Sequence, residues 1–144
     1  MTKFKTFQGT VYPWHCDHMG HMNVQYYVSM FDQAGWNIFS HLGLTMQFFK
    51  ETGRGMAAVE QNIKYKKELM AGENVYIETT VEEVREKVLI TKHTMFDGNS
   101  NVAAECRLVG VHLDAVKRKS VTFPDYILKK AKELAISQET LTQS

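Results

Sequence analysis

The sequence predicts an α+β fold in which one long helix packs against a curved antiparallel sheet of about five strands. Two observations support this: apolar residues recur at helical spacing after Asn23, and several alternating, strand-like segments follow residue 55. A third is that the helix and the sheet would each have a single apolar face, and packing one on the other buries both. No repeat or linker interrupts this order, so we expect one domain over residues 1–144.

The first elements are a strand near Thr6–Tyr12 and then the long helix. Asn23 is a good N-cap residue, so the helix is expected to begin there. The apolar residues that follow it at helical spacing are Tyr27, Phe31, Ala34, Ile38 and Leu42. The opposite positions, among them Asp32, are polar, which indicates a helix of about five turns that buries one stripe. A short second helix or an irregular segment is expected over Thr45–Glu51.

Four further strands are expected after the break at Gly53-Arg54-Gly55. They cover Met56–Lys67, Asn74–Arg85, Val88–Phe96 and Val102–Leu113. Residues 85–87 and 97–101 have the length and composition of hairpin connections, so the strands that they join should be antiparallel neighbours. A terminal helix is expected from Pro124 to about Leu134, and the polar tail from about residue 136 is expected to fray.

Charge and composition disfavour several classes of protein. There are 17 basic and 16 acidic residues, and the resulting formal charge of +1 favours neither nucleic acid nor an anionic membrane as a partner. No apolar run approaches the ~20 residues of a membrane span, and the first residues lack a signal-peptide core, so a cytoplasmic location is expected. Cys16 and Cys106 are expected to be free thiols in a reducing compartment.

The segment over residues 17–27, DHMGHMNVQYY, brings one carboxylate and two imidazoles to the start of the long helix. The first turn of a helix presents unpaired backbone N–H groups and the positive end of the macrodipole, which can polarise a carbonyl oxygen. Asp17 lies only a few residues upstream, so a loop can fold its carboxylate back over this helix end. The segment therefore predicts the entrance to an active site.

These residues carry a resemblance to a known family. The pattern Asp17-x-x-Gly20-His21-x-x-x-x-Tyr26, followed by an amphipathic helix, resembles the acyl-CoA thioesterases of the hotdog fold, in particular the 4-hydroxybenzoyl-CoA thioesterase-like branch. A second match, V-x-x-x-I-x-Y-x-x-x-L leading to G-E-x-V over residues 59–75, is similar to the next strand and turn of that family. The resemblance covers most of the chain up to about Val81 and implies an acyl-CoA substrate, no bound cofactor, and homodimers or homotetramers with active sites at the dimer interface.

Hydrolysis of a thioester requires a carboxylate or similar base beside fixed hydrogen-bond donors. Asp17 and the helix start at Asn23 can supply both, with Asp17 either attacking the carbonyl to form an anhydride or deprotonating a water molecule. His21 is the second catalytic candidate, and its alternative role is to orient the loop. Its spacing from Asp17 resembles a motif of acyl-carrier-protein thioesterases, but those enzymes have an asparagine where this chain has Met19.

Five residues are predicted to contact the substrate: Gly20, Asn23, Tyr26, Tyr27 and Arg54. The two tyrosines are alternatively core residues. Arg54 is the candidate for the coenzyme A phosphates, and the lysines at 64, 66 and 67 are alternatives to it. No metal is expected, because the adjacent side chains of residues 15–18 cannot converge on one tetrahedral ion.

Several acyl groups are compatible with the sequence. Trp14, Trp36 and the aromatic start of the helix suit an aromatic group, a fatty chain or a quaternary ammonium such as betaine. Two other functions also stay open. One is a non-catalytic subunit that binds acyl-CoA or acyl-carrier protein, and the other is an enoyl-CoA hydratase of the same fold. The hydratase would place its aspartate and histidine five residues apart with an asparagine between them, whereas Asp17 and His21 are four apart.

Overall fold

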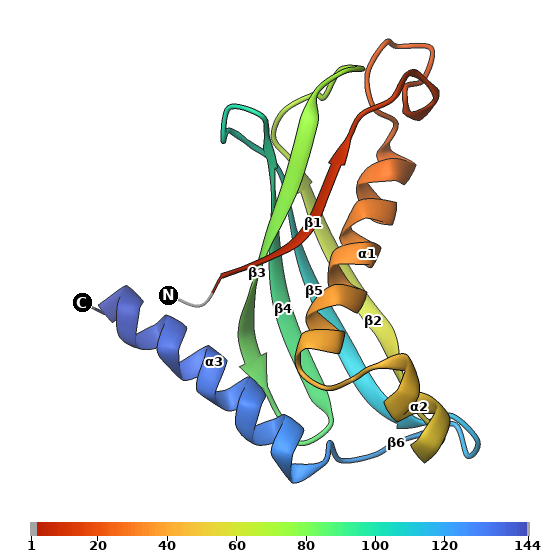
Figure 1. Cartoon of the computed structure of the whole chain (residues 1–144), viewed down its shortest axis with the longest axis vertical. Helices are drawn as coiled ribbons and strands as arrows, with labels where there is room; N and C mark the ends of the chain where they lie inside the picture. The colour runs from red at the N-terminus through yellow and green to blue at the C-terminus, as the bar shows by residue number, and fades with distance from the viewer. Residues whose placement is uncertain (1–2, 144) are drawn as a thin grey trace.

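A curled antiparallel sheet with one long helix along its inner face is the framework of the molecule (Figure 1). The computed structural model describes the backbone of residues 3–143 and the side chains as far as Ala135. The elements in chain order are β1 (Phe4–Thr10), the 3-10 turn η1 (Pro13–His15), α1 (Val24–His41), α2 (Met46–Thr52), β2 (Arg54–Tyr65), β3 (Asn74–Val84), β4 (Val88–Asp97), β5 (Val102–Asp114), β6 (Lys119–Ser120) and α3 (Asp125–Gln143). No helix within the described residues is long and apolar enough to cross a membrane.

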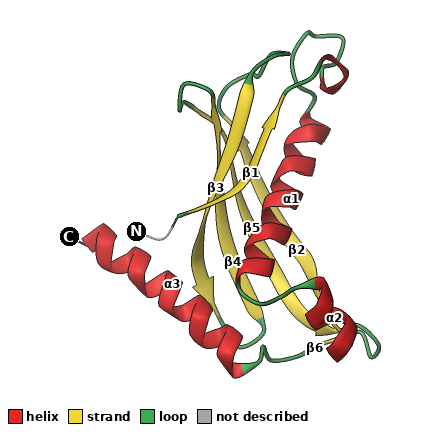
Figure 2. Ribbon diagram, viewed as in Figure 1, coloured by secondary structure: helices red, strands yellow, loops and turns green. Residues whose placement is uncertain are grey.

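The strand order in the sheet is β1-β3-β4-β5-β2, and every pair is antiparallel (Figure 2). The two-residue strand β6 pairs with the end of β5. Both predicted hairpins are confirmed, since β3 pairs with β4 and β4 with β5. The pairings of β1 with β3 and of β2 with β5 join segments that are far apart in the sequence. They complete the sheet and leave β1 and β2 as its two edges.

Helix α1 begins and ends as its sequence pattern predicts. The side-chain oxygen of Asn23 accepts a hydrogen bond from the Gln25 amide, so the predicted N-cap is confirmed. The helix spans 18 residues, which is five turns. Its buried face consists of Tyr27, Met30, Phe31, Ala34, Gly35, Ile38 and Phe39. This face covers the inner side of the sheet and forms the core.

The other elements differ from the expectations mainly at their ends. The region over Thr45–Glu51, which was open between a helix and an irregular segment, is the helix α2, capped by the Thr45 hydroxyl and ended by Gly53 in a left-handed conformation. The structure continues α3 to Gln143, whereas the sequence predicted an end near Leu134. The first strand runs from Phe4 to Thr10, two residues earlier than predicted. The turn η1 and strand β6 were not predicted.

A buried polar network crosses the inner face of the sheet below α1. His93 is fully buried, and its Nδ1 lies 2.6 Å from Thr79 Oγ1 while its Nε2 lies 3.0 Å from Thr91 Oγ1. Thr79 Oγ1 in turn lies 2.8 Å from Thr6 Oγ1. Both ring nitrogens are therefore hydrogen-bonded without any charged partner, as a neutral imidazole requires. Burial lowers the pKa of His93 to about 4.

Candidate active site

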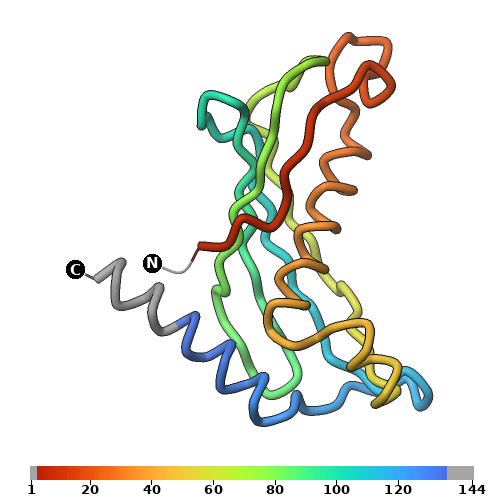
Figure 3. The backbone as a smooth tube through the Cα atoms, in the orientation of Figure 1, coloured from red at the N-terminus to blue at the C-terminus, as the bar shows by residue number. Residues whose placement is uncertain are grey.

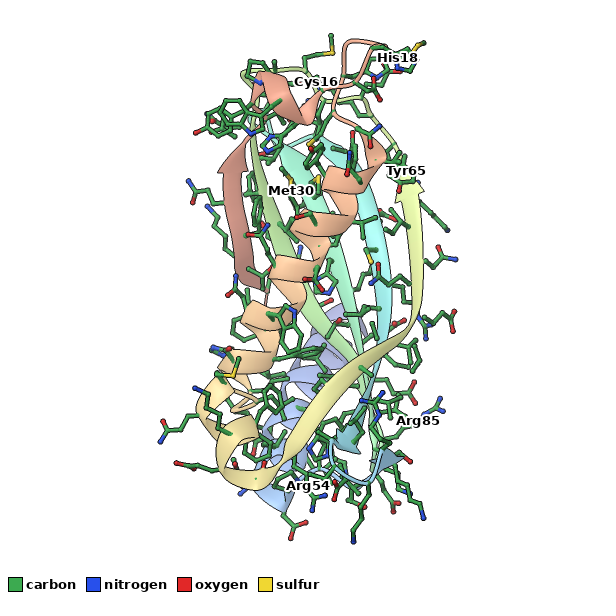
Figure 4. All side chains as sticks on the ribbon, turned by 90° about the vertical axis from the view of Figure 1, so that its right-hand side faces the viewer. Cys16, His18, Met30, Arg54, Tyr65 and Arg85 are labelled. Atoms are coloured by element: carbon green, nitrogen blue, oxygen red, sulfur yellow. The ribbon has the colours of Figure 1, made fainter. Side chains whose placement is uncertain are left out.

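Asp17 lies in a tight turn just before α1. The Asp17 amide donates to the carbonyl oxygen of His21 (3.1 Å), and the Gly20 amide donates to that of Asp17 (3.0 Å). Gly20 has φ of 90°, a left-handed conformation that glycine adopts without strain. Figure 4 shows Cys16 and His18 of this turn at the upper end of the molecule. Figure 3 shows that the segment 66–73 reaches the same end, where the Met22 amide donates to Leu69 (2.7 Å).

Two hydrogen bonds hold the carboxylate of Asp17. Its Oδ1 accepts from the Met19 amide (2.9 Å), and its Oδ2 accepts from Asn23 Nδ2 (3.0 Å). The bond from Asn23, followed by that from Met19, lowers the pKa of Asp17 below its usual value. The carboxylate is therefore ionised at neutral pH. Asn23 uses its amide oxygen to cap α1 and its amide nitrogen to hold Asp17, so one side chain ties the carboxylate to the helix start.

The first turn of α1 retains one free donor next to this carboxylate. The Gln25 amide donates to Asn23 Oδ1 (3.1 Å), and the Tyr26 amide donates to the Asn23 carbonyl oxygen (3.0 Å). The Val24 amide has no acceptor among the residues that the structure describes. At the positive end of the helix, this N–H can polarise a substrate carbonyl. The Val24 amide is thus an unpaired donor of the predicted kind, and the sequence did not single it out.

The side chain of His21 contacts Glu68 and is not hydrogen-bonded to Asp17. Its Nε2 lies 3.4 Å from Oε2 of Glu68 in the segment 66–73, and no hydrogen bond joins it to Asp17 among the described side chains. The backbone carbonyl of His21 does accept from Asp17, so the residue supports the turn. This geometry favours the loop-orienting alternative, and a catalytic role for His21 stays a prediction. Glu68 as its partner was missed, because nothing in the local pattern connects the two segments.

The remaining candidates for substrate contact lie in different places. Tyr27 is buried, and its hydroxyl donates to the carbonyl oxygen of Lys67 (3.2 Å). Burial raises the pKa of Tyr27 to about 12. Tyr27 therefore packs in the core, which was the alternative to substrate contact. Tyr26 is half-buried, with its ring centroid 4.7 Å from that of His15. Arg54 is at the opposite end of α1 (Figure 4), where its Nη1 lies 3.1 Å from Oδ2 of Asp114. One chain alone therefore does not bring Arg54 to Asp17.

A cavity that the sequence did not predict lies between α1 and the strands β2 and β5. Its volume is about 80 Å³. The side chains that shape it include Phe31, Asp32, Trp36, Phe39, Met56 and Cys106. Asp32 is exposed, as the sequence predicted, and it reaches the cavity from the solvent-facing side of the helix. The only local signal for the cavity was the spacing of four residues between Asp32 and Trp36. Residues 31–39 lie about 10 to 22 Å along the helix axis from Val24, so the cavity is remote from Asp17 of the same chain.

The other candidate groups are accounted for by local contacts. Lys67, one of the alternatives to Arg54, pairs with the buried carboxylate of Asp97, which lowers the pKa of Asp97. Cys16 and Cys106 are free thiols, and burial raises the pKa of Cys106 to about 11. Within the described residues no three His, Cys, Asp or Glu side chains are placed to share a metal ion.

The geometry of the turn leads to a prediction for Gly20. Gly20→Ala is expected to lower kcat/KM by about 10- to 100-fold, because a strained turn displaces the carboxylate of Asp17. An added Cβ would meet nothing within 4 Å, so the strain comes from φ alone. Gly72→Ala is the matched control, since Gly72 has φ of 94° and equally open space but holds no part of the Asp17 turn. The measurement is steady-state thioester hydrolysis, with the folding of both variants checked by circular dichroism. Equal losses of kcat/KM in both variants would contradict the prediction.

Comparisons with known proteins agree with this architecture. A betainyl-CoA thioesterase of Pseudomonas aeruginosa is 24% identical over 139 residues, which cover 94% of this chain and 86% of that protein. A hypothetical protein of Staphylococcus aureus in complex with CoA has a TM-score of 0.87 at 18% identity, covering 94% of this chain and 86% of that one. A DHNA-CoA thioesterase of the same organism has a TM-score of 0.82 at 21% identity, covering 93% of each chain.

The structural similarities confirm the predicted hotdog fold. The finer assignment to the 4-hydroxybenzoyl-CoA thioesterase-like branch stays a prediction. The profile of the thioesterase-like superfamily matches residues 11–131, which is most of the chain and includes the Asp17 turn, α1 and all strands from β2 to β6. The chain therefore belongs to the thioesterase-like superfamily, and its enzyme class is that of the thioester hydrolases.

Proposed function

We propose that the protein hydrolyses an acyl-CoA thioester to a free carboxylic acid and coenzyme A, with Asp17 as the essential carboxylate. The observation that carries this proposal is the ionised Asp17 carboxylate, which Asn23 holds at the start of α1 next to the free Val24 amide. Negative charge develops on the carbonyl oxygen during attack, and an N–H at the positive end of a helix stabilises it there. The two groups supply the base or nucleophile and the electrophilic assistance that the reaction needs.

Two routes use the same geometry. In the first, an oxygen of Asp17 attacks the thioester carbonyl, the C–S bond breaks, and water then hydrolyses the mixed anhydride to the acid and free Asp17. In the second, Asp17 accepts a proton from the water molecule that attacks the carbonyl. The leaving thiolate of coenzyme A has a basicity near that of cysteine, whose pKa is about 8.5, so neither route needs a strong acid. Asp17 is required in both.

The apolar surface supports a dimer. Val24, Val28 and Trp36 follow one side of α1 and are 56%, 38% and 46% exposed. The neighbouring edge strand β2 also exposes Val59 (60%) and Tyr65 (49%). A 12-residue open edge with exposed apolar side chains is a surface that soluble proteins normally cover. Two copies that pair their β2 edges antiparallel would bury it.

Such a dimer would also complete the active site. The end of β2 near residue 65 lies at the Asp17 end of α1, because Tyr27 bonds to Lys67 there. Antiparallel pairing would therefore set the Asp17 end of one copy beside the Arg54 end of the other, close to the cavity between α1 and β2. In this arrangement Arg54 can reach a coenzyme A phosphate whose thioester lies at the other copy's Asp17. Assembly of dimers into tetramers and a cytoplasmic location stay predictions.

The shared site predicts complementation between two inactive variants. One carries Asp17→Asn. The other fills the cavity, which would hold the acyl group in such a dimer, with Gly35→Leu, or with Met56→Trp if Gly35→Leu fails to fold. Unfolding and refolding an equal mixture gives half heterodimers, each with one intact site of two, so about a quarter of wild-type activity is expected to return. Recovery to no more than the sum of the two variants would contradict a site built from two copies.

The function itself is tested by following thioester absorbance with short, long, aromatic and betainyl coenzyme A esters. Direct absorbance avoids a thiol reagent, which would react with the two cysteines. Turnover of any ester supports the proposal. Saturable binding of these esters without turnover would instead establish a non-catalytic binding subunit, and hydration of an enoyl-CoA without hydrolysis would establish a hydratase.

A further inference from the structure

We propose that the hairpin between β5 and β6 binds the phosphate groups of coenzyme A and so selects coenzyme A esters over thioesters that lack this nucleotide. The inference rests on the proposed thioesterase activity, because it assigns a site to the carrier end of the substrate. Residues 114–120, DAVKRKS, form this basic hairpin, which lies beside α2 at the lower end of the molecule (Figure 1). Its three basic residues are Lys117, Arg118 and Lys119.

The basic hairpin extends a row of charged residues across the end of the sheet. Asp114 of β5 lies opposite Lys119 of β6 in one ladder and opposite Arg54 of β2 in the other. Residues directly opposite each other in a sheet project their side chains from the same face. Met56, two residues after Arg54, lines the cavity beside α1, so this is the face that α1 covers. The row therefore lies on the same side of the sheet as α1.

Asp114 organises this region and does not neutralise it. Its Oδ1 accepts from the amides of Val116 and Lys117, each at 2.9 Å, and its Oδ2 lies 3.1 Å from Arg54 Nη1. A guanidinium has five N–H donors, so Arg54 keeps donors for a phosphate oxygen while this bond fixes its position. One carboxylate is therefore set against Arg54 and the three basic residues of the hairpin.

The charges of the basic hairpin are otherwise unbalanced. All three basic residues are exposed, and none of them forms an ion pair with a side chain that the structure describes. Cations that lie close together repel one another, and an anion with several charges relieves this repulsion. Coenzyme A offers a diphosphate and a 3′-phosphate in one compact group, and arginine and lysine are the side chains that bind phosphate.

The backbone of Arg118 has a conformation that other residues adopt more easily. Its φ is 60°, in the left-handed region that favours glycine and asparagine. The Arg118 amide donates to the carbonyl oxygen of Asp114 (2.8 Å), which holds this conformation. An arginine at such a position indicates a role for its side chain, because the turn itself would form more easily without it.

In the proposed dimer, the basic hairpin lies where the nucleotide end of the substrate is expected. The Asp17 end of one copy is set beside Arg54 of the other, and β6 is two strand spacings, or about 10 Å, further across the sheet. Coenzyme A carries its phosphates at the opposite end of a long pantetheine arm from the thioester. The arm can therefore pass Arg54 while the nucleotide reaches the hairpin.

The first test measures kcat and KM with the coenzyme A ester that the protein hydrolyses fastest. Replacing both hairpin lysines, with Lys117→Gln and Lys119→Gln, is expected to raise KM about tenfold at unchanged kcat, because contacts remote from the carbonyl stabilise ground and transition states equally. The control removes two charges from the exposed side of α3 with Lys129→Gln and Lys132→Gln, and it should keep the wild-type KM.

Arg118→Asn separates binding from folding. It is expected to raise KM about fivefold through the lost charge, while thermal stability is retained or increased because asparagine tolerates the left-handed conformation. A purely structural role of Arg118 would leave KM unchanged. The control is Ser100→Asn, since Ser100 is the other non-glycine residue with a positive φ, 63°, in the described part of the chain. It should keep the wild-type KM.

The second test removes the nucleotide from the substrate. The pantetheine thioester of the same acyl group is expected to have a KM about 50-fold higher than the coenzyme A ester, the product of the two effects above, and the hairpin variants should not raise it further. Adenosine 3′,5′-bisphosphate is expected to inhibit hydrolysis of the coenzyme A ester competitively in the wild type and more weakly in the variants.

Three results would overturn the inference. An unchanged KM for the coenzyme A ester in the hairpin variants, or an equal rise with the coenzyme A and pantetheine esters, would do so while leaving the thioesterase intact. A loss confined to thioesters of acyl-carrier protein would do so as well, and would make an acidic carrier protein the partner of the hairpin. Absence of turnover with every thioester would instead refute the proposed function and this inference with it.

Discussion

Asp17→Asn is expected to lower kcat/KM for thioester hydrolysis by about 10²- to 10⁴-fold, the loss typical of removing a general base. An asparagine side chain keeps the size of the aspartate and can still accept the hydrogen bond from the Met19 amide. It can neither attack the carbonyl nor accept a proton from water, so both proposed routes fail. The measurement is loss of thioester absorbance under substrate-limited conditions, with folding checked by circular dichroism.

Asp125→Asn is the control for this loss, because Asp125 is an exposed aspartate at the start of α3, far from the Asp17 turn. It should retain wild-type kcat/KM. The lowered pKa of Asp17 adds a second expectation: the active, ionised form persists below the usual aspartate range, so kcat/KM should not fall through an Asp17 titration until the pH is below about 4. Asp17→Asn with wild-type activity would show that the chemistry lies elsewhere.

The free energy of unfolding is expected to fall by about 2 kcal/mol between pH 7 and pH 5 because of His93. The pKa of His93 is about 4 in the folded protein and 6.5 as an ordinary histidine. As the pH falls below 6.5, the unfolded chain takes up a proton that the folded protein refuses, so stability decreases. The decrease ends below pH 4, where both states are protonated. Urea unfolding at several pH values measures it.

His93→Gln should flatten this pH dependence, since an amide can replace the bonds to the two threonines but does not titrate. His18→Gln removes an exposed histidine and should preserve the dependence. A residual slope is expected from His112, whose pKa burial also lowers. Asp97, which is paired with Lys67, does not contribute between pH 7 and pH 5. Its pKa is lowered in the folded protein, so its ionised form stabilises the fold above about pH 4, and this stability is lost only as the pH falls further. An unaltered slope in His93→Gln would contradict the prediction.

The parts of the fold that depend on near neighbours in the chain were predictable. The helical spacing and Asn23 defined the start of α1, and two short turns defined the hairpins β3-β4 and β4-β5. The pairing of β2 with β5 joins segments about 50 residues apart, for example Ile63 with Cys106, and no local pattern encodes it. The same holds for the cavity, because Met56 of β2 meets Trp36 only after the sheet has formed.

In the candidate site, too, the features that depend on near neighbours were predictable and those that depend on distant segments were not. Helix capping by Asn23 follows from its position and chemistry, but its hydrogen bond to Asp17 depends on the path of a loop that reverses at Gly20. Periodicity placed Tyr27 on the apolar stripe and could not decide between core and pocket, which the bond from its hydroxyl to Lys67 resolves in favour of packing. Asp32 is exposed, as its place in the helical pattern predicted, and its share in the cavity depends on strands β2 and β5, which no local pattern brings to it.

The distance between the Asp17 turn and the cavity along α1 bears on how such enzymes diversify. The carboxylate is held by a short closed loop whose bonds involve Met19 and Asn23 but no residue of the cavity. Substitutions at Asp32 or Trp36 therefore leave the bonds that hold Asp17 in place. After a gene duplication, the middle of this helix could change while the groups proposed for catalysis stay intact, so the two ends of one helix can evolve at different rates.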